Sequence, residues 1–197
     1  MERIKALVEQ ISQREDAVTQ ENGEIILCGA IPGTRPTEYC CELFKPLGEQ
    51  DIRELAEGYR NPFPKPLEEF YRITNGAFLF GRWLSIFGMP AWSAQYKQPI
   101  ALAFADGHRT KKCPKERLFF ASYSTEPETQ MFFDTREAGG TMKVYAAKYG
   151  SNDIIAEWPS FADWLLSEHE RLAQRYARGE YRLEDIVPGV LTGISFE

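Results

Sequence analysis

The segment from Asn61 to Gly76 constrains the fold more than any other stretch of the chain. Pro64 and Pro66 mark its start, because proline fixes φ near the helical value and lacks an N–H group that a first helical turn leaves unpaired. One stripe of residues recurs at helical spacing: Leu67, Phe70, Tyr71 and Thr74. Glycine takes the left-handed conformation without a Cβ clash, so the segment predicts a short amphipathic helix that ends at Asn75-Gly76.

Three further helices are expected, two before this segment and one after it. Residues 1–14 carry apolar side chains at helical spacing, and Gly48 opens a second helix that runs to Tyr59 with acidic residues in its first turn. The last begins at Ser160, where Ser160 and Asp163 have the spacing of a capping box, and it continues towards Arg178.

Short aliphatic and aromatic runs separated by turn residues predict the strands, which are residues 25–27, 78–87, 118–123, 130–134, 142–147 and 153–158. Residues 78–87 fit either a hairpin or a bulged strand, and we count them as one strand. Short connections favour an antiparallel meander. The expected fold class is α+β, an antiparallel, strongly twisted sheet of about five or six strands with helices packed on one face and at the edge.

Four short sequence motifs, in this order along the chain, resemble those of the SUKH superfamily: residues 47–55, 63–76, 84–88 and 159–165. The resemblance covers roughly Pro46 to Leu172 and rests on residues whose expected role is structural: Pro64, Phe70, Asn75, Gly76, Gly88 and Trp164. It implies the fold described above and, for bacterial members, an immunity protein that binds a toxin. Related eukaryotic proteins are regulators and scaffolds in cell-wall signalling.

The resemblance divides the chain into three parts. Residues 1–45 are expected to be an N-terminal helix and extension packed on the core, and residues 46–178 the SUKH-like domain. Residues 179–197 form a tail too apolar for a solvated linker, which either packs back on the domain, as we expect, or meets another chain.

Composition argues against nucleic-acid and membrane binding. The formal net charge of −6 disfavours a surface for phosphate backbones, which bind lysine and arginine. The chain opens without a charged-then-apolar leader, and no apolar run approaches the roughly 18 residues of a spanning helix. We expect a soluble cytoplasmic protein, a monomer or weak homodimer.

The sequence predicts neither a metal, a cofactor nor catalysis. Its four cysteines, Cys28, Cys40, Cys41 and Cys113, form no Cys-x-x-Cys pair and have no histidine at ligand spacing. It contains no zinc-protease, nucleophile-elbow or phosphate-loop motif.

The expected function is therefore non-catalytic binding of a cognate protein toxin, which the resemblance implies. Nuclease toxins tend to be basic, and acidic residues on strand ends and loops are the candidate contacts: Glu126, Glu128, Asp134, Glu137, Asp153 and Glu157. A solvated rim explains the same residues equally well. Trp92 and Tyr96 lie in a long connector that is either structural or a contact surface. The alternatives are a general regulatory or scaffold domain and a small-ligand or glycan-binding module.

Overall fold

The computed structural model describes residues 1–27, 41–58, 62–89, 99, 114–123, 129–137, 141–148, 151–178 and 180. Its helices are α1 (Glu2–Ser12), α2 (Glu49–Glu57), α3 (Lys65–Tyr71) and α5 (Phe161–Ala177). Its strands are β1 (Ala17–Thr19), β2 (Ile25–Leu27), β3 (Cys41–Leu43), β4 (Ala77–Leu79), β5 (Leu84–Ile86), β6 (Arg117–Tyr123), β7 (Thr129–Asp134), β8 (Val144–Lys148) and β9 (Ile154–Trp158).

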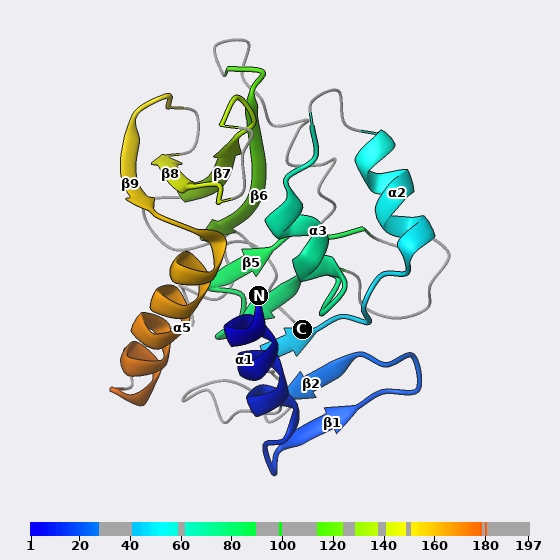
Figure 1. Ribbon diagram of the computed structural model, residues 1–197. Helices are drawn as coiled ribbons and strands as arrows, with labels where there is room; N and C mark the ends of the chain where they lie inside the picture. Colours follow the sequence, from blue (N-terminus) through cyan, green and yellow to red (C-terminus); the bar gives the residue numbers. More distant parts are fainter. Residues whose placement is uncertain are drawn as a thin grey trace, which may run out of the picture.

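Within the described residues, the strands form one antiparallel sheet of nine strands in sequence order, from β1 to β9. The α+β class is confirmed, but the expected number of strands is wrong. β1 and β3 are three residues each, too short to show an alternating pattern. The sheet is twisted: β1 to β5 run across the lower part of Figure 1, whereas β6 stands nearly upright above them.

Residues 78–87, which we counted as one strand, form the hairpin of β4 and β5. Its turn contains three successive residues with positive φ, namely Phe80 at 52°, Gly81 at 63° and Arg82 at 72°. A left-handed backbone is costly for residues with a Cβ atom, so the surrounding contacts must hold this turn. One of them is the guanidinium of Arg82, which lies 4.3 Å from the centre of the Phe78 ring.

The helix at Pro64 begins as expected and ends earlier. Pro64 is the N-cap of α3 and Pro66 lies in its first turn, but the C-cap is Arg72 in a right-handed conformation. Gly76 does have a positive φ of 81°, yet it lies beyond the helix, just before β4. Its assignment as the helix C-cap is therefore wrong. The reason is a close approach of chains, because a Cβ atom on Gly76 would lie 2.7 Å from the carbonyl oxygen of Ile86.

One face of the sheet packs against α1, α3 and α5 (Figure 1). Aromatic rings dominate this contact. Phe120 of β6 lies 5.1 Å from Trp164 of α5 and 5.4 Å from Phe161, and Phe70 of α3 lies 5.2 Å from Phe161. The buried aromatic cluster therefore joins two helices to the middle of the sheet, and burial of this apolar area stabilises the domain.

Side-chain hydrogen bonds mark where α2 and α5 start. Ser160 accepts a hydrogen bond from the backbone N–H of Asp163 at 3.1 Å, as the capping-box spacing predicts. The Ser160 hydroxyl also donates a hydrogen bond to the Asp163 carboxylate at 2.7 Å. The carboxylate of Asp51 accepts a hydrogen bond from the N–H of Gly48 at the start of α2. Within the described part of the chain, no helix is long and apolar enough to cross a membrane.

Candidate functional site

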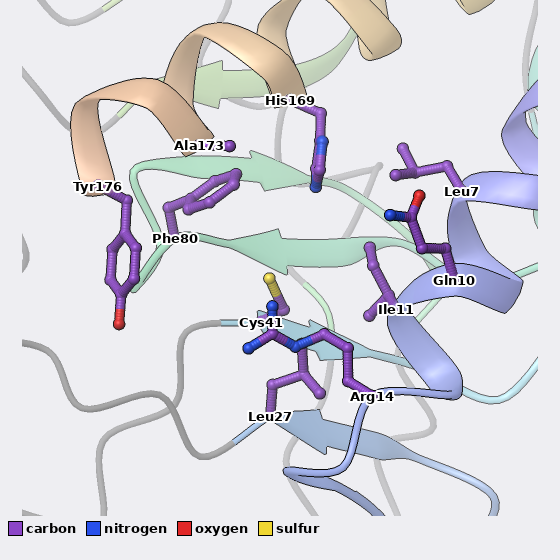
Figure 2. A pocket seen from close by; sticks show the side chains of 10 residues that line it. All are labelled: Leu7, Gln10, Ile11, Arg14, Leu27, Cys41, Phe80, His169, Ala173 and Tyr176. Carbon is purple, nitrogen blue, oxygen red and sulfur yellow. The ribbon is translucent and has the colours of Figure 1, made fainter. Parts of the chain in front are cut away.

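A pocket of about 270 Å³ lies between α1, the second half of α5 and the sheet (Figure 2). Its floor consists of Leu27 and Cys41, which are paired in register on β2 and β3. The full set of lining residues is Leu7, Gln10, Ile11, Arg14, Leu27, Cys41, Phe80, His169, Ala173 and Tyr176. A concave site with mixed apolar and polar walls is the usual form of a small-ligand site.

The wall formed by α5 is aromatic, because the β4–β5 turn carries Phe80 to the helix. The ring of Phe80 lies 5.3 Å from the imidazole of His169 and 6.1 Å from the ring of Tyr176. The opposite wall is aliphatic and comes from Leu7 and Ile11 of α1. The left-handed turn therefore has a structural consequence here, because it supplies the ring that both α5 side chains contact.

Two polar side chains face the pocket without a hydrogen-bond partner in the described structure: His169 of α5 and Gln10 of α1. Burial lowers the pKa of His169, so its imidazole is neutral at pH 7. A neutral imidazole and an amide each offer one donor and one acceptor side. Arg14 is held differently, since its guanidinium donates to both carboxylate oxygens of Asp16 at 2.8 and 2.9 Å.

The pocket shows no arrangement for covalent or metal chemistry among the residues described. Cys41 is a buried free thiol, and no group of three or more histidine, cysteine, aspartate or glutamate side chains is placed to hold a metal ion there. The arrangement can bind an uncharged, partly apolar group. Cys28, Cys40 and Cys113 lie outside the described residues.

Three of the acidic residues predicted to bind a partner come together on the sheet face opposite α5. Asp134, Glu137 and Glu157 all raise the pKa of Tyr145, and we call these four residues the Tyr145 cluster. Burial is the largest cause of the rise to about 12, followed by the hydrogen bond that the Tyr145 hydroxyl donates to Glu137. Glu157 lies directly opposite Tyr145 in the β8–β9 register.

Two of the three carboxylates of this cluster form ion pairs within the chain. Arg136 donates hydrogen bonds to Asp134 and holds the pKa of that carboxyl below its usual range. Lys143 lies 3.3 Å from Glu157 in an ion pair whose side chains are about half exposed. The expected acidic contact surface is thus a mixed-charge surface at this point.

Asp153 is not among the carboxylates that raise the pKa of Tyr145. Asp153 lies just before β9, where it accepts a hydrogen bond from Ser151 at 3.1 Å. Glu126, Glu128, Trp92 and Tyr96 lie outside the described residues, so their assignment stays a prediction.

The residues that carry the resemblance hold the α3–β4–β5 unit together. The side-chain amide of Asn75 bonds both backbone groups of Met89, each at 2.7 Å. Gly88 lies against this bridge, because a Cβ atom there would be 2.6 Å from Asn75 oxygens. Phe70 and Trp164 are buried, and Pro64 caps α3.

The pocket does not follow from the sequence. The apolar stripes of α1 and α5 predict that each helix buries one side, but they do not predict that the two helices face each other across β2 and β3. Gln10 and Arg14 lie among polar residues at the end of α1, and His169 lies in a charged stretch of α5. No local pattern distinguishes these three side chains from solvated ones.

Comparison with known proteins identifies a family and no individual relative. No curated protein and no solved structure matches the chain. The family model described as SMI1 / KNR4 family (SUKH-1) matches residues 46–167. Of the residues that line the pocket, only Phe80 lies within this match. Because the match spans more than half of the sequence, the chain belongs to the SMI1/KNR4 (SUKH-1) family.

Proposed function

We propose that this protein is a non-catalytic immunity protein that acts in the bacterial cytoplasm, as a monomer or weak homodimer, and neutralises a cognate protein toxin by direct binding. The family match over residues 46–167 is the observation that carries the proposal. This family supports a protein-binding role, in immunity or in regulation, and such a role needs neither a cofactor nor a nucleophile.

The charge of the chain is compatible with a basic partner, such as a nuclease toxin. With a net charge of −6, the protein attracts a cationic partner over a distance and increases the rate of encounter. The exposed pair of Lys143 and Glu157 does not oppose this, because exposed ion pairs contribute about 0–1 kcal/mol and exchange partners readily. Basic side chains of a partner can replace lysine at Glu157.

The test is co-expression with the toxin domain encoded beside this gene. Immunity predicts rescue of growth and a stable complex that forms without added cofactor. The association rate constant should fall by about 10-fold or more when salt rises from about 0.05 M to about 0.5 M, whereas the dissociation rate constant should change much less. Absence of both rescue and complex would contradict immunity and leave a general regulatory or scaffold domain.

The pocket favours a second candidate, a small-ligand-binding module. The neutral donor and acceptor groups of His169 and Gln10, together with the Phe80 ring, suit an uncharged planar or sugar-like ligand. A panel of uncharged ligands should then raise the melting temperature of the wild type and not of a Gln10→Leu variant, with little dependence on salt. A panel without such a hit argues against this candidate.

A further inference from the structure

β9 is an edge of the sheet in the described structure, and none of its residues is buried. β8 pairs with one side of it, and the sheet order ends there. Two of its residues, Ile154 and Ile155, are 51% and 47% exposed, and Val18 on β1 is the only other large hydrophobic residue of the described chain that is exposed. An edge strand offers unpaired backbone groups to a segment of another chain.

A β-bulge explains why both isoleucines are uncovered. Ile154 pairs with Ala147 and Ala156 pairs with Ala146, so Ile155 is the extra residue between the two pairs. The inner neighbours are alanines, whose side chains end at Cβ and do not reach over the isoleucines. The two isoleucines therefore form an exposed apolar surface on the edge strand.

The opposite edge of the family domain is closed in this chain. Residues 46–167 contain β4 to β9, and β3 pairs with β4 through the register Leu43↔Ala77 to Cys41↔Leu79. β1 and β2 extend this cover further. Among the described strands, β9 is therefore the one uncovered edge of the family-matched sheet.

The residues that flank the isoleucines carry negative charge. Asp153 precedes them and Glu157 follows, and both side chains are exposed. When two copies of β9 pair antiparallel around Ile155, Asp153 of each copy lies opposite Glu157 of the other, which is unfavourable for like charges. A partner strand with lysine or arginine at these positions fits instead.

We propose that β9 is the docking edge for an extended segment of a basic protein partner. Backbone hydrogen bonds of that segment continue the sheet beyond β9, an apolar side chain packs on Ile154 and Ile155, and basic side chains face Asp153 and Glu157. The assignment deepens the proposed immunity function, on which the choice of partner rests, and names its contact surface.

The first experiment compares two edges of the same sheet. Ile154→Lys with Ile155→Lys places positive charge on the proposed edge, and Val18→Lys does so at an equally exposed site on β1. Circular dichroism and the melting temperature establish that both variants are folded. Binding of the neighbouring toxin domain should weaken by about 100-fold or more for the β9 variant, since two central contacts are lost, and stay within about 3-fold of wild type for Val18→Lys.

The outcomes separate this inference from the proposed function. A wild-type complex that the β9 substitutions leave unchanged overturns the docking edge and leaves immunity intact. A concentration-dependent dimer in light scattering that is abolished by the same substitutions overturns it as well, since β9 then belongs to a second copy of the chain.

A peptide probe tests the edge even where the toxin domain does not bind. The probe is Thr-Lys-Val-Ile-Val-Lys-Thr, and its control carries N-methyl groups on alternate amides, which removes backbone donors from one side of the strand. Amide signals of residues 153–157 should shift in NMR spectra with the probe and not with the control. Unchanged β9 signals, or equal shifts with both peptides, overturn the proposal.

Discussion

Gly76 provides the sharpest test of how the α3–β4–β5 unit is built, because the chain contains a matched control for each of its two constraints. Gly76 has a φ of 81°, and a Cβ atom on it would lie 2.7 Å from the Ile86 carbonyl oxygen. Gly23 has nearly the same φ, 83°, but its nearest neighbour would be the flexible side chain of Lys45 at 3.5 Å. Gly88 has the close contact without the left-handed backbone, since Asn75 oxygens would lie 2.6 Å away.

The expected costs of alanine substitution follow from these distances. At Gly23 only the left-handed conformation matters, which lowers the free energy of unfolding by about 1–2 kcal/mol. At Gly76 the backbone of β5 must also move, and displacement in a packed interior costs about 1–3 kcal/mol more. Gly76→Ala should therefore lower the free energy of unfolding by about 2–5 kcal/mol, and Gly88→Ala by about 1–3 kcal/mol from the contact alone.

Urea unfolding followed by tryptophan fluorescence measures the three variants. The free energy of unfolding of a small protein falls by about 2 kcal/mol per M urea, the middle of the usual range. A difference of about 2 kcal/mol in this free energy between Gly76→Ala and Gly23→Ala therefore separates their urea midpoints by about 1 M. Coincident midpoints would refute the claim that close approach of Ile86, and not only positive φ, requires glycine at position 76.

Other predictions concern buried polar groups. Asn75→Ala removes both hydrogen bonds to Met89 and should lower the free energy of unfolding by about 2–3 kcal/mol in the same urea assay. Tyr123→Phe removes the hydroxyl that donates to the buried carboxylate of Glu168, and it should lower the free energy of unfolding by about 1–3 kcal/mol. An unchanged urea midpoint would show that this hydrogen bond contributes nothing to stability. Because burial lowers the pKa of His169, the unfolded chain binds its proton more readily, so stability should decline as pH falls below about 6.5 towards the folded pKa. A His169→Leu variant should lose this part of the pH dependence, and an identical pH profile would contradict it.

Local signals in the sequence predict the helices well and the sheet only in part. Pro64 and the Ser160–Asp163 pair act through their immediate neighbours, so the starts of α3 and α5 follow from the sequence. The end of α3 does not, because the position of Gly76 depends on a contact with β5. A distant backbone, and not the helix, requires its conformation.

The sequence predicts the acidic candidates as separate residues and does not predict their environment. Glu137 and Glu157 are far apart in the sequence, and only the β7–β8–β9 register brings them both to Tyr145. The ion pair of Glu157 with Lys143 likewise depends on that register. Charge patterns along a chain give the residue types at a surface, but pairing across strands decides which charges remain available to a partner.

The N-terminal extension supplies β1 and β3, two of the strands that the sequence did not predict, and it shapes both candidate sites. Residues 46–167 contain only β4 to β9, where five strands were expected because residues 78–87 were counted as one. β1 to β3 add to the β4 side, and residues of the extension, from α1 to β3, line most of the pocket. An uncovered β4 would present backbone groups like those of β9 and compete for extended segments. By closing that edge, the extension leaves β9 as the strand at which a partner can continue the family-matched sheet.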